Sequence, residues 1–296
     1  MFIKSVKPGA QIATDHALNN ELPGDPLILI APPRAWPSLE LAELWRYREL
    51  LMILAWRDIK VRYKQTVLGA AWAVLQPVMT MVVFSFIFGT VAKLPSEGIP
   101  YPIFTFTALL PWQLFARALN ESSNSLIYNQ QLVTKVYFPR LIIPIGTILS
   151  GLIDFAIALF VLGILMLFYR VPLTWNVLFL PAFIFLAILT ALAVGIWLSA
   201  INVEYRDVRY TLPFLTQFWM LATPIAYSSA IIPREWLWLY SLNPMAGVVE
   251  GFRWALLGTG YFSLPYFIIS LVVMAGLFAG GLAYFRKMED VFADRL

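Results

Sequence analysis

The chain has 296 residues, of which 60% are hydrophobic and only 13% are charged, and its mean hydropathy is +0.75. Soluble globular proteins carry about 25% charged residues, so this chain has too few to cover a water-exposed surface. The composition excludes a soluble enzyme, a disordered protein and a nucleic-acid-binding domain despite the net charge of +4, and it predicts an all-α integral membrane protein.

Motifs that would make the chain a catalyst on its own are absent. It has no cysteine and a single histidine, His16, so neither a disulfide nor a thiolate or histidine metal site is expected. It also contains no GxxxxGK[ST], HExxH or GxSxG motif. We therefore expect no catalytic residue, no metal and no nucleotide-binding loop in this chain.

The N-terminal part divides into an arm, residues 1–38, and an amphipathic segment, residues 39–66. The segment predicts a helix in the membrane interface, although 58–64 also alternates as a strand does. The simpler interpretation of this segment is a membrane anchor held by anionic lipids. The alternative is an entrance for an anionic lipid headgroup, lined by Arg48, Arg57, Lys60, Arg62 and Lys64.

Six hydrophobic runs in the domain 67–288 predict membrane crossings, because a core about 30 Å thick needs about 20 apolar residues. Pro111 interrupts the second run, and Pro213 and Pro224 interrupt the fifth. A count of four crossings would leave aromatic residues of these two runs in water. The runs are 68–91, 103–118, 141–168, 177–200, 211–227 and 262–285.

The distribution of Lys and Arg predicts the orientation. Seventeen of them lie in 1–71, 116–140, 202–210 and 286–296, and four lie in the loops on the opposite side. Because cytoplasmic loops are enriched in positive residues, we expect the arm 1–38 and the tail 289–296 in the cytoplasm. No cleavable signal peptide is expected, so the first crossing acts as the membrane signal.

Two cytoplasmic loops follow from this topology. In 119–140, Asn120, Ser122 and Ser123 predict the start of a short amphipathic helix, which either packs on neighbouring loops or docks a cytoplasmic partner. In 202–209, four charged residues predict pairing within the loop. They are Glu204, Arg206, Asp207 and Arg209.

The outer segment 228–261 is apolar but too short to cross. Its last stretch, 245–257, reaches only about 20 Å at 1.5 Å per residue. We therefore expect two short re-entrant or interfacial helices that form an outer rim before the last crossing. Glu250 and Arg253, three residues apart, are positioned to pair there.

Asp154 is the ionisable residue in the middle of the third run. A charged group at that depth is a functional-site hypothesis by default, and an interhelical hydrogen bond is its structural alternative. A proton relay is disfavoured, because no second acid or histidine lies inside the predicted crossings. Clusters of aromatic residues offer surfaces on which sugar rings stack, although packing against lipid also explains them. The candidates for lining a channel are Phe84, Phe88, Phe218, Trp219 and Tyr227.

Four motifs in order resemble the permease family of ABC-type polysaccharide exporters. They are RYRELLMILAWRDIKVRYKQTVLGAAWAVLQPV (46–78), LVTKVYFPR (132–140), NVEYRDVRYTLPFLTQFWMLATPIAY (202–227) and LNPMAGVVEGFRW (242–254). The resemblance covers about 40–290. It implies the type-2 ABC exporter permease fold with six transmembrane helices in a bacterial inner membrane.

The resemblance also implies roles for individual residues. Arg48, Arg57, Lys60 and Arg62 would contact the pyrophosphate of a lipid-linked substrate. Segment 121–138 would be the helix that couples to an ATPase, with candidate residues Asn129, Leu132, Val133, Lys135, Tyr137, Phe138 and Arg140. The rim would be the outer gate, with candidates Trp236, Trp238, Asn243, Pro244, Glu250 and Arg253.

The leading hypothesis is a membrane subunit that exports a lipid-linked, O-antigen-like polysaccharide through a channel formed by a permease dimer. Its expected partners are a second copy, two cytoplasmic subunits that bind ATP and Mg, the lipid-linked substrate and membrane lipids, with no nucleic acid. One alternative is an exporter of teichoic acid, a drug or a simple lipid. A membrane-embedded glycosyl- or acyltransferase is the other, and Glu204 and Asp207 are its nearest paired carboxylates.

Overall fold

A computed structural model describes residues 41–64, 69–259, 262–289 and 292–295, and every regular element in this part of the chain is a helix. The all-α prediction is confirmed for these residues. Four helices are long and apolar enough to cross a membrane, and they coincide with the first, third, fourth and sixth predicted runs: Ala71–Val91, Ile142–Phe168, Trp175–Glu204 and Leu264–Glu289. The predicted arm, 1–38, lies outside the described residues.

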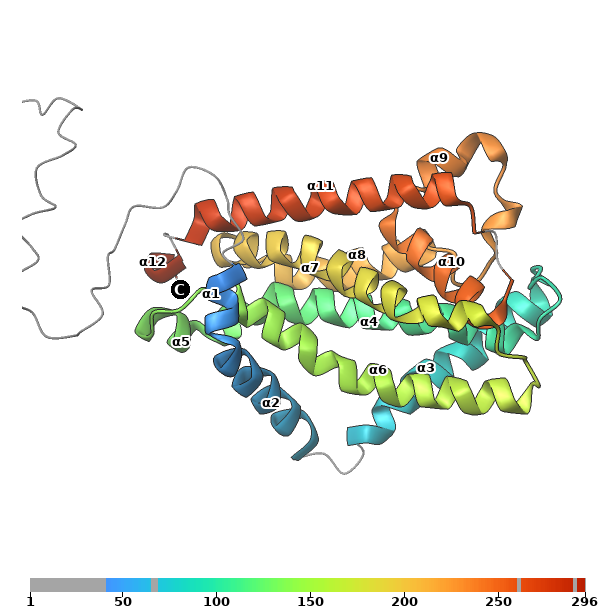
Figure 1. Cartoon of the computed structure of the whole chain (residues 1–296), viewed down its shortest axis with the longest axis horizontal. Coiled ribbons are helices and arrows are strands. Elements are labelled where there is room, and N and C mark those ends of the chain that lie inside the picture. Colours follow the sequence, from blue (N-terminus) through green and yellow to red (C-terminus); the bar gives the residue numbers. More distant parts are fainter. Residues whose placement is uncertain (1–40, 65–68, 260–261, 290–291, 296) are drawn as a thin grey trace, which may run out of the picture. The chain divides into compact units, whose positions relative to one another are not determined.

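The long helices α4, α6, α7 and α11 run in a common direction, α2 and α3 cross them obliquely, and short helices lie at both ends (Figure 1). α5 and α12 lie at one end, and α9 and α10 lie at the other. In chain order the elements are α1 (Leu41–Arg46), α2 (Arg48–Lys64), α3 (Gly69–Phe84), η1 (Ser85–Val91), α4 (Tyr101–Tyr128), α5 (Gln130–Lys135), α6 (Ile142–Phe168), η2 (Trp175–Phe179), α7 (Leu180–Glu204), α8 (Val208–Leu221), η3 (Ser229–Ile231), η4 (Arg234–Trp236), α9 (Leu237–Tyr240), α10 (Pro244–Leu257), α11 (Leu264–Glu289) and α12 (Phe292–Arg295).

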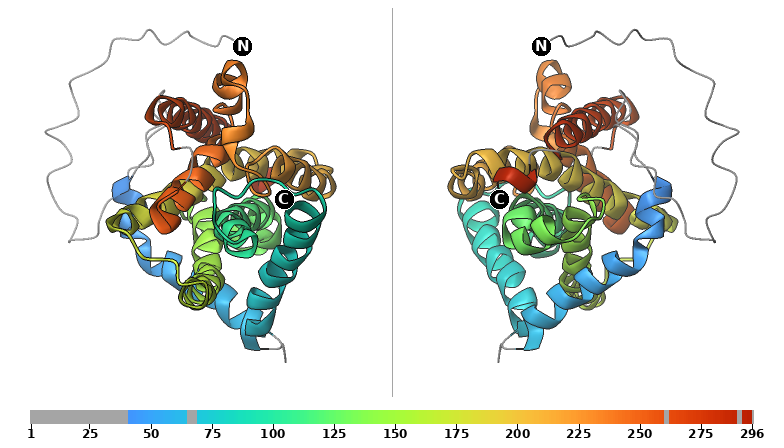
Figure 2. Two further views of the ribbon diagram at one scale, coloured as in Figure 1. Left: turned by 90° about the vertical axis from the view of Figure 1, so that its right-hand side faces the viewer. Right: turned by 90° about the vertical axis from the view of Figure 1, so that its left-hand side faces the viewer.

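α4 is the central helix of the bundle. It packs against α3, α6, α7, α8 and α10, and the two end-on views show it enclosed by them (Figure 2). Most of its side chains are buried, including Phe104, Phe106 and Phe115. A helix covered by protein on most sides needs no apolar surface for lipid, which explains why α4 is less hydrophobic than its neighbours although it has 28 residues.

The segment 119–140, predicted as a loop, is largely helical. The helix start that was expected at its beginning was wrong. α4 continues ten residues beyond Ala118, and the capping roles expected of Asn120, Ser122 and Ser123 do not occur. Ser123 instead donates to the Leu119 carbonyl within the helix at 2.7 Å. The residues just beyond the expected helix end, Ser122 to Leu126, are all buried, and their packing stabilises the continued helix.

The predicted interfacial segment forms two helices, α1 and α2, with a break at Tyr47. The strand alternative for 58–64 is excluded, because α2 continues to Lys64. α2 packs on α6 through Leu54 and Ala55, which are buried. Met52 is exposed, as are Trp45, Ile53, Trp56 and Val61. Exposed apolar side chains of this kind are typical of a helix that contacts lipid.

α8 is shorter than the expected element, and the rim contains short helices. α8 has 14 residues and ends at Leu221, although the run 211–227 predicted a longer crossing. The rim contains the short helix α9 and the 14-residue α10. Asn243 begins α10 by accepting a hydrogen bond from the Met245 amide at 3.1 Å, and Pro244 follows at the first helical position.

Two glycines of α11 provide a matched test of its packing on α7. A Cβ at Gly281 would overlap the Trp197 indole and lie 2.7 Å from the Ala193 carbonyl oxygen, whereas a Cβ at Gly276 would meet nothing within 4 Å. We expect Gly281→Ala to destabilise the protein by about 1–3 kcal/mol through overpacking. Gly276→Ala should be neutral or stabilising, because alanine favours helix by about 1 kcal/mol. Melting temperatures of the two variants in detergent check this, and equal shifts would contradict it.

Candidate functional site

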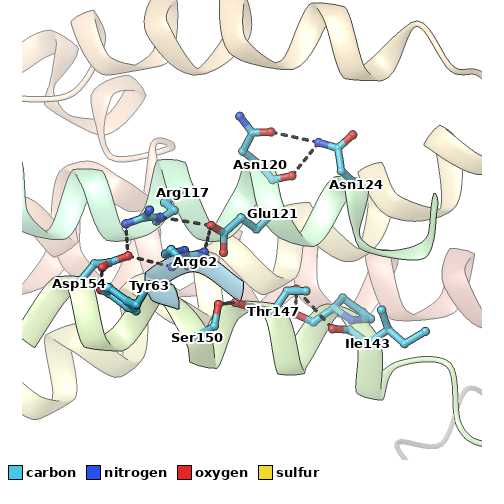
Figure 3. A network of polar contacts seen from close by, with 11 residues as sticks. Arg62, Tyr63, Arg117, Asn120, Glu121, Asn124, Ile143, Thr147, Ser150 and Asp154 are labelled. Carbon is cyan, nitrogen blue, oxygen red and sulfur yellow. Dashed lines mark hydrogen bonds and ion pairs between the residues drawn. The ribbon is translucent and has the colours of Figure 1, made fainter. Parts of the chain in front are cut away.

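Asp154 on α6 is contacted by side chains from two other helices (Figure 3). Arg62 of α2 places its Nη1 atom 2.8 Å from Oδ2 of Asp154. Arg117 of α4 forms an ion pair with the same oxygen, and the Tyr63 hydroxyl donates to Oδ1. The carboxylate therefore joins the interfacial helix α2 to α4 and α6.

Glu121 completes this group, one turn beyond Arg117 on α4. It accepts from Nη2 of Arg62, and its Oε1 atom lies 3.2 Å from Nε of Arg117. Two arginines are thus neutralised by two carboxylates, and we call Arg62, Tyr63, Arg117, Glu121 and Asp154 the ion network. Asp154 is only 6% exposed, so its charge depends on these partners for compensation.

Tyr63 remains a donor at any physiological pH. Burial, followed by its hydrogen bond to the Asp154 carboxylate, raises the pKa of the Tyr63 hydroxyl to about 12. The proton therefore stays on the tyrosine, and Asp154 accepts from it. The Tyr63 hydroxyl is therefore the donor in the hydrogen bond that holds the C-terminal end of α2 to α6.

The structure does not bring the four predicted headgroup residues together. Arg62 lies in the ion network, and Arg57 bonds Asp58 at 2.7 Å and the Asn129 side chain at 2.8 Å. Arg48 and Lys60 are exposed and lie over nearby tryptophan rings, Arg48 at 5.4 Å from Trp45 of α1 and Lys60 at 5.5 Å from Trp56 of α2. These two positions resemble basic and aromatic anchors at a membrane interface.

The segment around α5 has a buried and an exposed side. Of the residues predicted to couple to an ATPase, Asn129, Val133 and Phe138 are buried and Leu132 is half-buried. Lys135 and Tyr137 are exposed, and 88% of Tyr137 is accessible. Arg140 is held against the C-terminal end, with its guanidinium 5.8 Å from the Phe292 ring. The exposed side of α5 is therefore available to a partner, while the other side fixes it to the bundle.

The rim contains a second charged pair, which is buried. Arg253 is 1% exposed and lies 3.4 Å from Glu250, so the expected pair forms. Its guanidinium also donates to the carbonyls of Ile225, at 2.8 Å, and Tyr227, at 3.1 Å, and it lies 3.7 Å from the Phe104 ring centroid. Trp236 and Trp238 point outward and are more than half exposed.

The predicted channel aromatics divide into inner and outer residues. Trp219 packs on Phe115 at 5.0 Å between ring centroids and donates to Asn243 at 2.9 Å, which links α8 to the rim. Phe218, on the same helix, is 65% exposed. Phe84 and Phe88 are half-buried and contact each other edge to face at 5.3 Å. Tyr227 is half-buried and accepts from the Tyr240 hydroxyl at 3.2 Å.

The pairing expected within 202–209 was wrong, because among the described residues no ion pair joins two members of this loop. The carboxylate of Glu204 bonds Arg295 of α12 at 2.6 Å, which ties the C-terminal end to α7. Asp154 and Glu204 are thus both held by arginines, and within the described ranges no three His, Cys, Asp or Glu residues are grouped as a metal site would require.

Comparisons with known proteins identify the family of the chain. Residues 49–257 match the ABC-2 type transporter family. The chain is 31% identical over 214 residues to the O-antigen export system permease protein RfbA of Myxococcus xanthus, across 71% of this chain and 81% of that protein. It is 30% identical to RfbA of Klebsiella pneumoniae, across 84% and 95% of the two chains. It is 28% identical to the polysialic acid transport protein KpsM of Escherichia coli, across 79% and 91%.

Proposed function

Because this chain belongs to the ABC-2 type transporter family and is the membrane subunit of an ABC polysaccharide exporter, we propose that two copies of it form the channel for a lipid-linked, O-antigen-like polysaccharide. The observation that carries this proposal is the similarity to O-antigen export permeases over most of both chains. The membrane is the bacterial inner membrane, and both termini lie in the cytoplasm.

We propose six crossings, of which α3, α6, α7 and α11 are long and apolar. α4 has 28 residues, or about 42 Å, which is ample for a core about 30 Å thick. α8 reaches only about 21 Å, so the buried segment 223–226 that follows it completes the fifth crossing. The rim helices then close the outer end as a gate.

ATP and Mg bind to two separate subunits, because this chain has no phosphate-binding loop. We propose that the exposed side of α5 docks on such a subunit. The hydrogen bond from Arg57 to Asn129 links α2 directly to the junction between α4 and α5, and Arg62 links α2 to Glu121 on α4. A displacement of α5 would therefore also move the interfacial helix α2, whose residues Arg48 and Lys60 face the lipid headgroups.

Two aromatic residues of equal exposure test the docking role of α5. Tyr137 is 88% exposed beside α5, and Trp175 is 87% exposed at the opposite end of the bundle. In cells that depend on this chain and its ATP-binding subunit, we expect Tyr137→Ala to lower surface polysaccharide at least tenfold at unchanged protein level. Trp175→Ala should stay within twofold of the unsubstituted chain.

Equal export by the two variants would contradict docking through α5. Stimulation of the purified complex's ATPase activity tests the substrate class separately. Lipid-linked O-antigen should stimulate it, and stimulation by a drug, a simple lipid or teichoic acid alone would favour the alternative exporters.

A further inference from the structure

A cavity of about 230 Å³ lies where the ends of several helices meet on the α5 side of the bundle. The α4–α5 junction contributes Ile127 and Gln130, and the end of α7 contributes Asn202. Three arginines also line the cavity: Arg206 and Arg209 from the turn into α8, and Arg295 from α12. None of these arginines belongs to the ion network.

The described residues that line the cavity carry an excess of positive charge. Glu204 bonds Arg295, and Asp207, in the same turn, is exposed and does not line the cavity. In the part of the chain that the structure describes, Arg206 and Arg209 form no ion pair, although Arg209 lies 6.0 Å from the Tyr128 ring centroid. Guanidinium groups bind carboxylates and phosphates through two parallel hydrogen bonds, so an anion is the expected occupant.

The position of the cavity favours a protein carboxylate over a lipid phosphate. α4 is about 12 Å longer than an apolar core, and in the proposed topology its last turn, where the cavity lies, is on the cytoplasmic side. The neighbouring α5 has four polar residues out of six, in the sequence QQLVTK, and its two apolar residues are half-buried or buried. The cavity thus opens toward water beside the helix proposed to dock on the ATP-binding subunit.

We propose that this arginine cavity receives an acidic side chain of the ATP-binding subunit, as a second contact beside α5. This inference rests on the proposed function. Tyr205 and Tyr210 flank Arg206 and Arg209 in sequence, and Tyr128 follows Ile127. Their exposed rings offer the aromatic surface that protein interfaces favour. A volume of about 230 Å³ is sufficient for one aspartate or glutamate side chain.

The test compares charge reversal with neutralisation. The double variants Arg206→Glu/Arg209→Glu and Arg206→Gln/Arg209→Gln are each co-expressed with the ATP-binding subunit, and Arg234→Glu, exposed in the rim, serves as the control. We expect charge reversal to lower the co-purified ATP-binding subunit at least tenfold, and neutralisation to lower it severalfold and weaken its dependence on salt. The control should bind as the unsubstituted chain does.

Unchanged co-purification by both double variants, at the melting temperature of the unsubstituted chain, would overturn the inference. Loss of bound phosphatidylglycerol in native mass spectrometry, with the ATP-binding subunit retained, would overturn it in favour of a lipid. If the unsubstituted chain itself retains no ATP-binding subunit, the proposed function fails as well, which distinguishes the two failures.

Discussion

Replacing Asp154 with alanine is expected to lower the free energy of unfolding by about 3 kcal/mol, the lower end of the range for a broken buried ion pair. The substitution leaves Arg62 and Arg117 without the carboxylate that both contact, and it removes the acceptor of Tyr63. The partial exposure of the two arginines moderates the loss, because water screens their charges. The melting temperature in detergent should fall by roughly 6–12 °C.

Asp207→Ala is the matched control, because Asp207 is exposed and forms no ion pair among the described residues. Its melting temperature should change by no more than about 2 °C, since exposed substitutions have small effects. A double-mutant cycle of Asp154→Asn and Arg62→Gln should show a coupling of about 1 kcal/mol or more. Additive effects of the two substitutions would mean that the ion network contributes nothing as a unit.

Replacing Arg253 with alanine is expected to cost about 4 kcal/mol, because four interactions disappear at once. Glu250 would remain buried without its cation, the carbonyls of Ile225 and Tyr227 would lose their donor, and Phe104 would lose the charge above its ring. The segment that joins α8 to the rim would then be free to separate from α10. Limited proteolysis and the melting temperature in detergent measure both effects.

Arg253→Lys should lie between alanine and arginine in stability, since a lysine keeps the charge but has no planar fork to reach both carbonyls. Arg234→Ala is the control, because Arg234 is exposed in the same rim. If Arg253→Ala and Arg234→Ala have the same melting temperature, the buried pair does not hold the rim in place.

Hydropathy and charge were sufficient to predict the helical class and four of the long helices, because lipid-facing surface determines both signals. They placed the end of the second helix wrongly, since α4 is covered by protein and continues to Tyr128. The partners of Asp154 could also not be predicted from the sequence. Arg62 lies 92 residues away in a segment that reads as an interface helix, and Arg117 lies near the expected end of a crossing.

The enclosed position of α4 also has a consequence for how the protein is made. A translocon releases segments into the bilayer according to their hydropathy, and each Arg or Asp near a helix centre opposes release by about 2.5–3.5 kcal/mol. α4 carries Arg117 and Glu121, whose neutralising partners lie on α2 and α6. We expect nascent α4 to remain at the translocon until α6 has been synthesised, so that biogenesis proceeds by joint release of the two helices.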